Sequence, residues 1–185
     1  MATDRGPQPV LTGRRVRLRP WRPDDAPAVC AACQDAEVQR WTEVPVPYLP
    51  AHAAEFVGPL SAAGWAEGGA LFAAEELADD GLVGSMGLLS VHSGVAAAGY
   101  WTVAGRRRRG LTGEALRVLS GWALDVVGVR RVELVAHPAN TGSRRVAESA
   151  GFRAEGVLRS RYLHRGVPCD VVLYSLLTTD PRPPV

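Results

Sequence analysis

A turn rich in glycine and arginine carries the most recognisable chemistry in this sequence. Residues 105 to 113 read Gly-Arg-Arg-Arg-Arg-Gly-Leu-Thr-Gly and join an expected strand to an expected helix. The first N–H groups of a helix are unpaired and carry partial positive charge, and Gly110 and Gly113 let phosphate oxygens approach the main chain. Nearby arginines add two-point contacts to phosphate. The turn therefore predicts a pyrophosphate site.

Two other interpretations of the four arginines at 106–109 start from their charge alone: a solvated basic loop, or a patch that binds nucleic acid. The segment is not a Walker loop, since no Gly-Lys-Ser/Thr follows, and it does not contain G-x-G-x-x-G. A nucleic-acid interface would need interleaved aromatic residues or a recognition motif, and the sequence has neither. The position of the arginines, between a strand and a helix that begins at glycine, favours the phosphate site.

The elements that must position this turn alternate between strands and helices. Alternating charged and apolar residues from Arg15 to Arg19 indicate a half-buried strand, and the spacing of Leu116 and Leu119 indicates a helix. An Asp-Gly pair at residues 80 and 81 predicts a hairpin turn. We expect strands near residues 14–20, 71–77, 82–91, 97–103, 131–136, 152–161 and 170–177, and helices near 26–38, 51–63, 111–127 and 141–150. This order predicts an α/β fold with a mixed sheet.

Length and composition fit one domain with a sizeable core. The chain has 185 residues, of which 46% are apolar and 22% charged. Its 21 cations, all arginine, and 19 acids leave a net charge of +2, which gives no reason to expect broad coating of nucleic acid or membranes. We expect a flexible N-terminus at residues 1–9, a single domain at 10–177 and a flexible C-terminal tail at 178–185.

Targeting signals and cysteines point to the cytoplasm. No apolar run approaches the roughly 20 residues that a membrane span needs, and the N-terminus lacks the apolar core of a signal peptide. Cys30 and Cys33 form C-x-x-C, but no second Cys or His pair follows at zinc-like spacing, and Cys169 lies far away. We therefore expect a cytoplasmic protein with neither a disulfide framework nor a metal site.

Several segments together resemble the GCN5-related N-acetyltransferase (GNAT) superfamily, and within it the RimJ/RimL-like branch of ribosomal-protein N-terminal acetyltransferases. The resemblance covers residues 10 to 177. It is carried, in family order, by Arg15-Val16-Arg17-Leu18-Arg19-Pro20-Trp21, Gly99-Tyr100-Trp101, Arg107 to Gly113 with Glu114-Ala115, Asn140-Thr141-Gly142-Ser143, Gly151-Phe152, and Glu155-Gly156 with Arg159. It implies the GNAT fold, with about seven strands, about four helices, and acetyl-CoA in a cleft between splayed parallel strands.

The resemblance also implies which residues hold acetyl-CoA. The family's loop Q/R-x-x-G-x-G/A falls on Arg107, Gly110 and Thr112, with Thr112 in place of Gly or Ala, and Arg108 stands where this branch often has Gly. Asn140 would bind the cofactor arm and Ser143 would lie near its sulfur, although both also suit the plain role of capping a helix. The expected cofactor-binding residues are Trp101, Thr102, Val103, Arg107, Arg108, Arg109, Gly110, Leu111, Thr112, Gly113, Asn140 and Ser143.

The implied reaction is direct attack of a neutral amine on the thioester of acetyl-CoA. The backbone N–H around Val103 would stabilise the oxyanion, and Ser143 would be the catalytic acid, because Ala147 occupies the position where many relatives have tyrosine. The base stays open, since a glutamate expected before Gly99 is missing. Ordered water is one alternative, and the remaining side-chain candidates are Glu43, Glu75, Glu76, Glu155 and His137.

The acceptor would be a protein N-terminal amine or a small-molecule amine, because the cofactor motifs do not report on it. Its walls are expected from residues 41–48 and 164–168, where Glu43 would pair with a cationic acceptor. The missing base leaves a second hypothesis, an acyl-CoA-binding domain of this fold with little or no catalysis that acts as a sensor or partner protein. Trp65 and Trp122, if exposed, would mark a homodimer surface.

Overall fold

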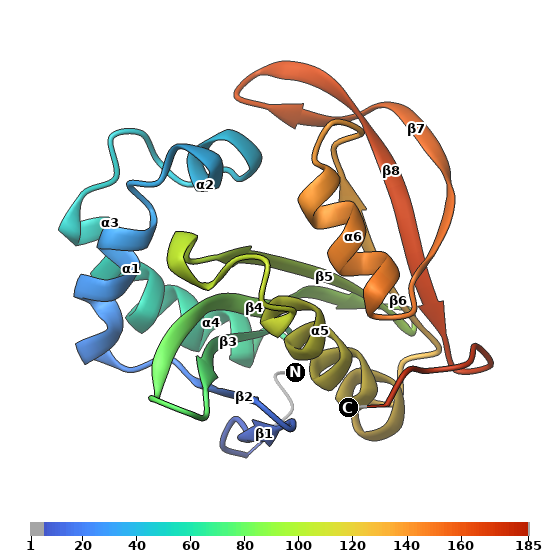
Figure 1. Cartoon of the computed structure of the whole chain (residues 1–185), viewed down its shortest axis with the longest axis horizontal. Helices are drawn as coiled ribbons and strands as arrows, with labels where there is room; N and C mark the ends of the chain where they lie inside the picture. Colours follow the sequence, from blue (N-terminus) through green and yellow to red (C-terminus); the bar gives the residue numbers. More distant parts are fainter. Residues whose placement is uncertain (1–5, 185) are drawn as a thin grey trace.

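One mixed sheet of eight strands forms the centre of the computed structural model, which describes residues 6–184 (Figure 1). The strands are β1 (Leu11–Thr12), β2 (Val16–Pro20), β3 (Ala70–Glu76), β4 (Gly81–His92), β5 (Val95–Thr102), β6 (Arg131–Ala136), β7 (Arg153–His164) and β8 (Val167–Leu177). Their order is β1-β2-β3-β4-β5-β6-β8-β7, and only β5 and β6 run parallel. The expected mixed sheet is confirmed, and the short β1 adds the strand that the sequence pattern did not predict.

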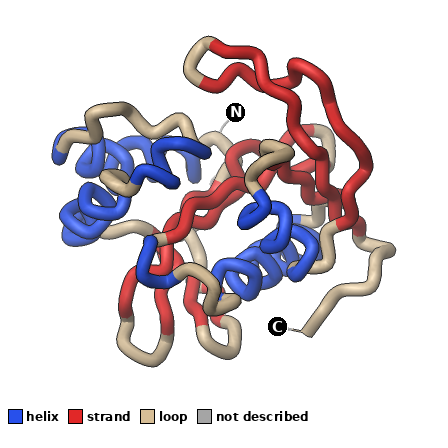
Figure 2. Tube along the Cα trace, turned by 45° about the horizontal axis from the view of Figure 1, so that its top comes forward, coloured by secondary structure: helices blue, strands red, loops and turns tan. Residues whose placement is uncertain are grey.

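Helices cover both faces of this sheet (Figure 2). They are α1 (Ala26–Ala32), α2 (Ala36–Trp41), α3 (Pro50–Glu55), α4 (Ser61–Ala66), α5 (Leu111–Trp122) and α6 (Thr141–Ser149), with short turns η1 (Pro23–Asp25), η2 (Phe56–Leu60), η3 (Ala104–Arg106) and η4 (Ala123–Val127). Successive strand residues point to opposite faces. Phe72 of β3 therefore packs into the core beneath α5 and α6, whereas its neighbours Leu71 and Ala73 pack with α1 and α3.

One of the expected helices is divided in two, and the helix expected at 51–63 is continuous with a π-helical middle. The helix expected at 26–38 is divided into α1 and α2, because the Asp35 side chain accepts hydrogen bonds from the N–H groups of Glu37 and Val38 and so begins a new helix. The helix expected at 51–63 consists of α3, η2 and α4. The expected hairpin between β3 and β4 is confirmed, with Asp80 at φ 52° in its turn. The interruption at Asp35 turns α2 away from the direction of α1.

The parallel strands β5 and β6 are paired over only three residues. Their register joins Val95, Ala96 and Ala97 of β5 to residues 131–133 of β6. Beyond Ala97, β5 continues to Thr102 on its pairing with β4, while β6 continues to Ala136 on its pairing with β8. The two strands therefore part in the middle of the sheet, as expected.

The long hairpin of β7 and β8 curves over one end of the molecule (Figure 1). The pairing of β7 with β8 is irregular between Leu158 and Tyr162, where Ser160 has a φ of 48° and donates its N–H to Asp170. An irregularity of this kind bends its strand. The bend carries the hairpin tip, with His164, toward the segment that links α2 to α3.

The chain ends contact the folded body where they are described. Residues 1–5 and 185 of the expected flexible segments lie outside the described part of the chain. The Gln8 side chain donates to the Leu71 carbonyl at 2.9 Å, and Arg182 pairs with Asp125 at 2.7 Å. Residues 6 to 184 contain no helix that is both long and apolar enough to cross a membrane, and no group of His, Cys, Asp or Glu side chains suited to hold a metal ion.

Trp65 and Trp122 contribute to the core rather than to an exposed apolar patch. Both are partly buried against the main core, and their rings stack with centroids 6.4 Å apart. A dimer surface at Trp65 and Trp122 would need exposed rings, and the exposure of these two side chains is limited.

Candidate active site

The parting of β5 and β6 opens into a cleft of about 1600 Å³. Pockets for a single small molecule measure roughly 300–1000 Å³, so this cleft has room for two substrates. One side is formed by β5, β6, the turn before α5 and the start of α6, and the other by α2, α3 and the segment between them. The tip of the β7–β8 hairpin contributes the third side.

The turn before α5 adopts the left-handed conformation twice. Arg108 has a φ of 60° and Gly110 a φ of 77°, and Gly110 forms the N-cap of α5. The Glu114 N–H donates to the Gly110 carbonyl at 3.1 Å and closes the first turn of α5. The N–H groups of the first residues of an α-helix, here those before Glu114, have no partner within the helix. The N–H groups of residues 111–113 are therefore available, and Gly110, Thr112 and Gly113 line the cleft.

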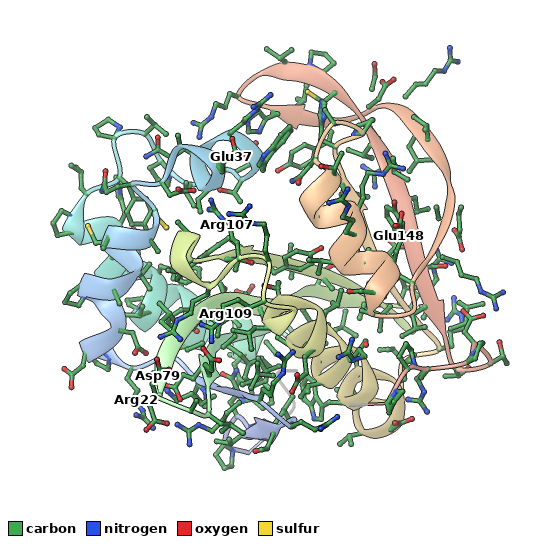
Figure 3. All side chains as sticks on the ribbon, viewed as in Figure 1. Arg22, Glu37, Asp79, Arg107, Arg109 and Glu148 are labelled. Carbon is green, nitrogen blue, oxygen red and sulfur yellow. The ribbon has the colours of Figure 1, made fainter. Side chains whose placement is uncertain are left out.

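Three of the four arginines in this turn are used to fix it. Arg107 pairs with Asp35 at the start of α2 and donates to the Thr102 carbonyl at 3.2 Å. Arg106 and Arg109 both pair with Glu76 of β3, the second at 2.7 Å. In Figure 3, Arg107 extends from the turn toward α2 and Arg109 lies on the other side of the turn.

Three cations that line the cleft have no ion pair within residues 6–184, and one of them, Arg165, is held by backbone carbonyls instead. Arg108 of the turn and Arg145 of α6 are exposed, line the cleft, and have no carboxylate partner among residues 6–184. Arg109, Val103 and the fully buried Leu111, which were expected in the cofactor site, do not line the cleft. Any contact from Leu111 to a ligand would come from its backbone.

The Thr112 side chain is held against strand β5. It is 7% exposed, and its Oγ1 lies 2.8 Å from Oγ1 of Thr102 on β5. This hydrogen bond ties the first turn of α5 to the strand. The threonine that stands in place of the family's Gly or Ala is thus accommodated by a hydrogen bond between α5 and β5.

The backbone of β5 alternates between its neighbour β4 and the cleft. The Val103 N–H donates to the Val83 carbonyl at 2.9 Å and is therefore occupied by β4. Because adjacent strand residues direct their backbone groups to opposite sides, those of Tyr100 and Thr102 face the side that β6 has left. The side chain of Trp101 stacks on Trp21 with centroids 6.4 Å apart. Tyr100 and Thr102 replace Val103 as the residues with N–H groups toward the cleft.

A pair of hydroxyl groups spans the cleft where β5 and β6 part. Tyr100 Oη lies 2.9 Å from Ser143 Oγ, and either hydroxyl can donate in this contact. Tyr100 Oη can also donate to the Ser143 carbonyl at 3.0 Å. Burial raises the pKa of Tyr100 to about 12, so the phenol stays protonated at neutral pH. Asn140 caps α6 by accepting the Ser143 N–H at 3.0 Å. The expected capping role is confirmed, and both residues also line the cleft.

Tyr100 is a candidate functional residue that sequence reasoning missed. It lies within Gly99-Tyr100-Trp101, a segment that was quoted only for its resemblance. The contact to Ser143 joins residues 43 positions apart, so no local pattern reveals it. Ala147 is fully buried and offers no hydroxyl, so Tyr100 supplies one from the opposite side.

The candidate bases divide into two groups. Three of them do not line the cleft, and each is paired with at least one arginine: Glu75, Glu76 and Glu155. Arg131, with help from Ser175, lowers the pKa of Glu155 to about 2, which makes this carboxylate a very weak base. The other two candidates, Glu43 and His137, line the cleft.

The side of the cleft opposite α5 and α6 combines carboxylates with aromatic rings. Glu37 and Glu55 line it together with Glu43. Trp41 donates its indole N–H to Glu37 at 2.8 Å, and its ring lies 5.3 Å from that of His137. Carboxylates attract an ammonium group, and aromatic faces hold cations. Arg40 on the same side already pairs with Glu37 at 3.7 Å and lies over the Trp41 ring, so attraction for an amine comes from Glu43 and Glu55.

Comparisons with known proteins identify one family. A family model for the acetyltransferase (GNAT) domain matches residues 15–153. The uncharacterized N-acetyltransferase p20 of Bacillus licheniformis is 27% identical over 177 residues, which cover 92% of this chain and 97% of p20. The probable N-acetyltransferase YjcK of Bacillus subtilis is 32% identical over 105 residues, covering 55% of this chain and 58% of YjcK. The chain thus matches over half of YjcK and nearly all of p20.

A solved structure extends this likeness to three dimensions. RimJ of Mycobacterium smegmatis, in complex with CoA-disulfide, is similar at a TM-score of 0.77 and 27% identity, covering 88% of this chain and 82% of RimJ. The likeness therefore includes the sheet and the helices that form the cleft.

Proposed function

Because the chain belongs to the GNAT acetyltransferase family and acetyl-CoA is its cosubstrate, we propose that it acetylates a primary amine by direct attack of the amine nitrogen on the thioester. The carrying observation is the Tyr100–Ser143 hydroxyl pair at the point where β5 and β6 part. A cation-binding side and a phosphate-binding side of one cleft meet at this point. The thioester supplies the activated acetyl group, and the residues of the chain supply binding and proton transfer.

The residues on the α5 and α6 side fit a CoA group. The free N–H groups at residues 111–113 would hold the pyrophosphate, and Arg108 and Arg145 would add charge beside it. Asn140 and the backbone of Tyr100 and Thr102 would hold the extended arm. Arg107 and Arg109 would act indirectly, since their ion pairs fix the turn.

The hydroxyl pair is suited to the departure of the thiolate. Ser143 would donate its proton to the sulfur, and Tyr100, which stays protonated, would stabilise the Ser143 oxygen by a hydrogen bond. The developing oxyanion would be bound by an N–H group of β5 that faces the cleft, from Tyr100 or Thr102. Both steps use groups that the fold holds in position before any substrate binds.

The acceptor would enter from the side that carries Glu37, Glu43 and Glu55. A positively charged amine is attracted there, whether it belongs to a protein N-terminus or to a small molecule. The resemblance to the RimJ/RimL-like branch points to a protein N-terminal amine and is equally compatible with a small-molecule amine.

Calorimetric titration with acetyl-CoA, followed by a thiol-release assay on amines and on peptides with free or blocked N-termini, tests this proposal. We expect binding that Arg108→Ala weakens and that Arg14→Ala, which removes an exposed arginine outside the cleft, leaves unchanged. Thiol release with free but not blocked amines is the expected activity. Binding without release on any amine would favour the acyl-CoA-binding sensor, and the absence of binding would contradict both functions.

A further inference from the structure

Three histidines line the cleft, and two of them present the wrong ring nitrogen to act as a base. His52 Nδ1 accepts the Leu49 N–H at 3.0 Å, and His137 Nδ1 accepts the Ala139 N–H at 3.1 Å. In a neutral imidazole one nitrogen accepts and the other carries the proton. His52 and His137 therefore hold their proton on Nε2 and have no second lone pair to offer. His137, a candidate base from the sequence, becomes a hydrogen-bond donor.

His164 has the opposite arrangement. Its Nδ1 lies 2.6 Å from Glu43 Oε1 across the junction of the hairpin tip and the α2–α3 segment. A carboxylate oxygen only accepts, so Nδ1 must carry the proton and donate it. The lone pair of the neutral ring is then on Nε2. A base whose second nitrogen is oriented by a carboxylate is the arrangement that activates nucleophiles in many enzymes.

The contact between the hairpin tip and the α2–α3 segment is held by more than this pair. Arg165 donates to the carbonyls of Gln39 and Val44 at 2.9 and 3.1 Å, which fixes the tip next to Glu43. His164 is thereby held at a fixed position on the acceptor side of the cleft, although it lies 121 residues from Glu43 in the chain.

We propose that His164 is the general base that removes the proton from the acceptor ammonium, and that Glu43 is the positioning residue that orients its ring. This assignment rests on the proposed amine acetylation. It fills the role for which the sequence offered no glutamate before Gly99. The base comes instead from the last residue of β7 at the hairpin tip, a position that neither the strand pattern nor the cofactor motifs mark.

The proton balance of the step is complete with groups already named. The ammonium N–H bond breaks, its proton passes to His164 Nε2, and the electron pair stays on nitrogen. That nitrogen bonds to the acetyl carbonyl carbon while the C–S bond breaks, and its second proton replaces the one that Ser143 gives to sulfur. After the amide leaves, His164 returns its proton to water. One ammonium and one thioester thus give one amide, one thiol and one proton.

The other groups near His164 set the conditions for a pH profile. Glu43 faces its Nδ1, and Arg165 follows it in the hairpin tip. Burial and the neighbouring Glu43 raise the pKa of Tyr162 on β7, and Cys169 lies opposite Tyr162 on β8. The Tyr162 phenol therefore stays protonated throughout an assay near neutral pH.

The test compares two acceptors that differ in whether a proton must be removed before the nitrogen can attack. An aliphatic primary amine is protonated at pH 7, with a pKa of about 10, whereas an aromatic amine is already neutral. We expect His164→Gln to lower kcat/KM for the aliphatic amine about 100-fold, within the usual range for general bases, and for the aromatic amine less than about twofold. The aliphatic defect should shrink as the pH rises toward 10. His92→Gln, outside the cleft, is the matched control and should leave both rates unchanged.

Equal losses for the two acceptors, or no loss for either, would overturn the assignment and leave amine acetylation intact. A wild-type protein that releases no thiol with any amine would overturn the proposed function and this assignment with it. Glu43→Gln should lower the aliphatic rate about tenfold and shift its pH profile, because the ring loses its orienting partner. Nitrogen chemical shifts of the histidine rings provide a test without activity: a neutral His164 with its proton on Nε2 would also overturn the assignment.

Discussion

Replacing Gly110 with alanine tests the turn before α5, and Gly128 provides a matched control. The two glycines lie before and after the helical segment 111–127, with φ angles of 77° and 79°. A Cβ in the left-handed conformation costs about 1–2 kcal/mol. Loss of unfolded-state entropy offsets about 0.4–1 kcal/mol of this, so each variant should lose about 1 kcal/mol of folding free energy. For a chain of this size the melting temperature should fall by about 2–4 °C.

The two variants should differ in their affinity for acetyl-CoA. A Cβ on Gly110 would approach Arg15 to 3.3 Å, and relief of the left-handed strain would redirect the N–H groups at residues 111–113, whereas a Cβ on Gly128 meets nothing within 4 Å. Hydrogen bonds to charged groups contribute about 1.5–3 kcal/mol. Loss of one would raise the Kd about tenfold or more. Calorimetry should detect this rise for Gly110→Ala and an unchanged Kd for Gly128→Ala. Equal affinities would refute the assignment of the phosphate site to this turn.

Three further predictions concern other contacts. Tyr100→Phe and Ser143→Ala should each lower kcat about 10- to 100-fold without changing acetyl-CoA affinity. Because the two hydroxyls act as a unit, the double variant should be about as slow as the slower single variant. Additive losses in steady-state assays would argue for separate roles. The Glu155 carboxylate, with a pKa lowered to about 2 by Arg131, stabilises the fold above pH 4.5 and loses this effect as the pH falls toward 2, so acid titration should destabilise the wild type more than Glu155→Gln. Asp35→Ala should lower the unfolding free energy by about 0.5–2 kcal/mol in urea, because α2 loses its cap; an unchanged midpoint would contradict that role.

The order of strands and helices could be predicted because it depends on local patterns. The alternation at residues 15–19 and the Asp-Gly turn each act within a few positions, and both elements are present. The break at Asp35 was missed, although its signal is local: a capping side chain followed by Ala and Glu at the start of α2. Helical spacing continues across such a break, so periodicity alone merges two helices into one.

The candidate site was predictable in its backbone and less so in its side chains. The turn before α5 was located correctly, because glycine and a helix start are local signals. The roles of its arginines depend on contacts across the chain, such as Arg107 with Asp35, 72 positions away. Sequence spacing cannot distinguish an arginine that fixes the turn from one that faces a ligand. The Tyr100–Ser143 pair was hidden for the same reason.

Hydrogen exchange of the wild-type chain with and without acetyl-CoA tests the central claim most directly. The account predicts slower exchange at the amides of residues 111–113, at Tyr100 and Thr102, and at the start of α6, because these groups would bind the cosubstrate. The amides of β1 and β2 should be unaffected. Protection that avoids the β5–β6 cleft, or no change on addition of acetyl-CoA, would contradict the account.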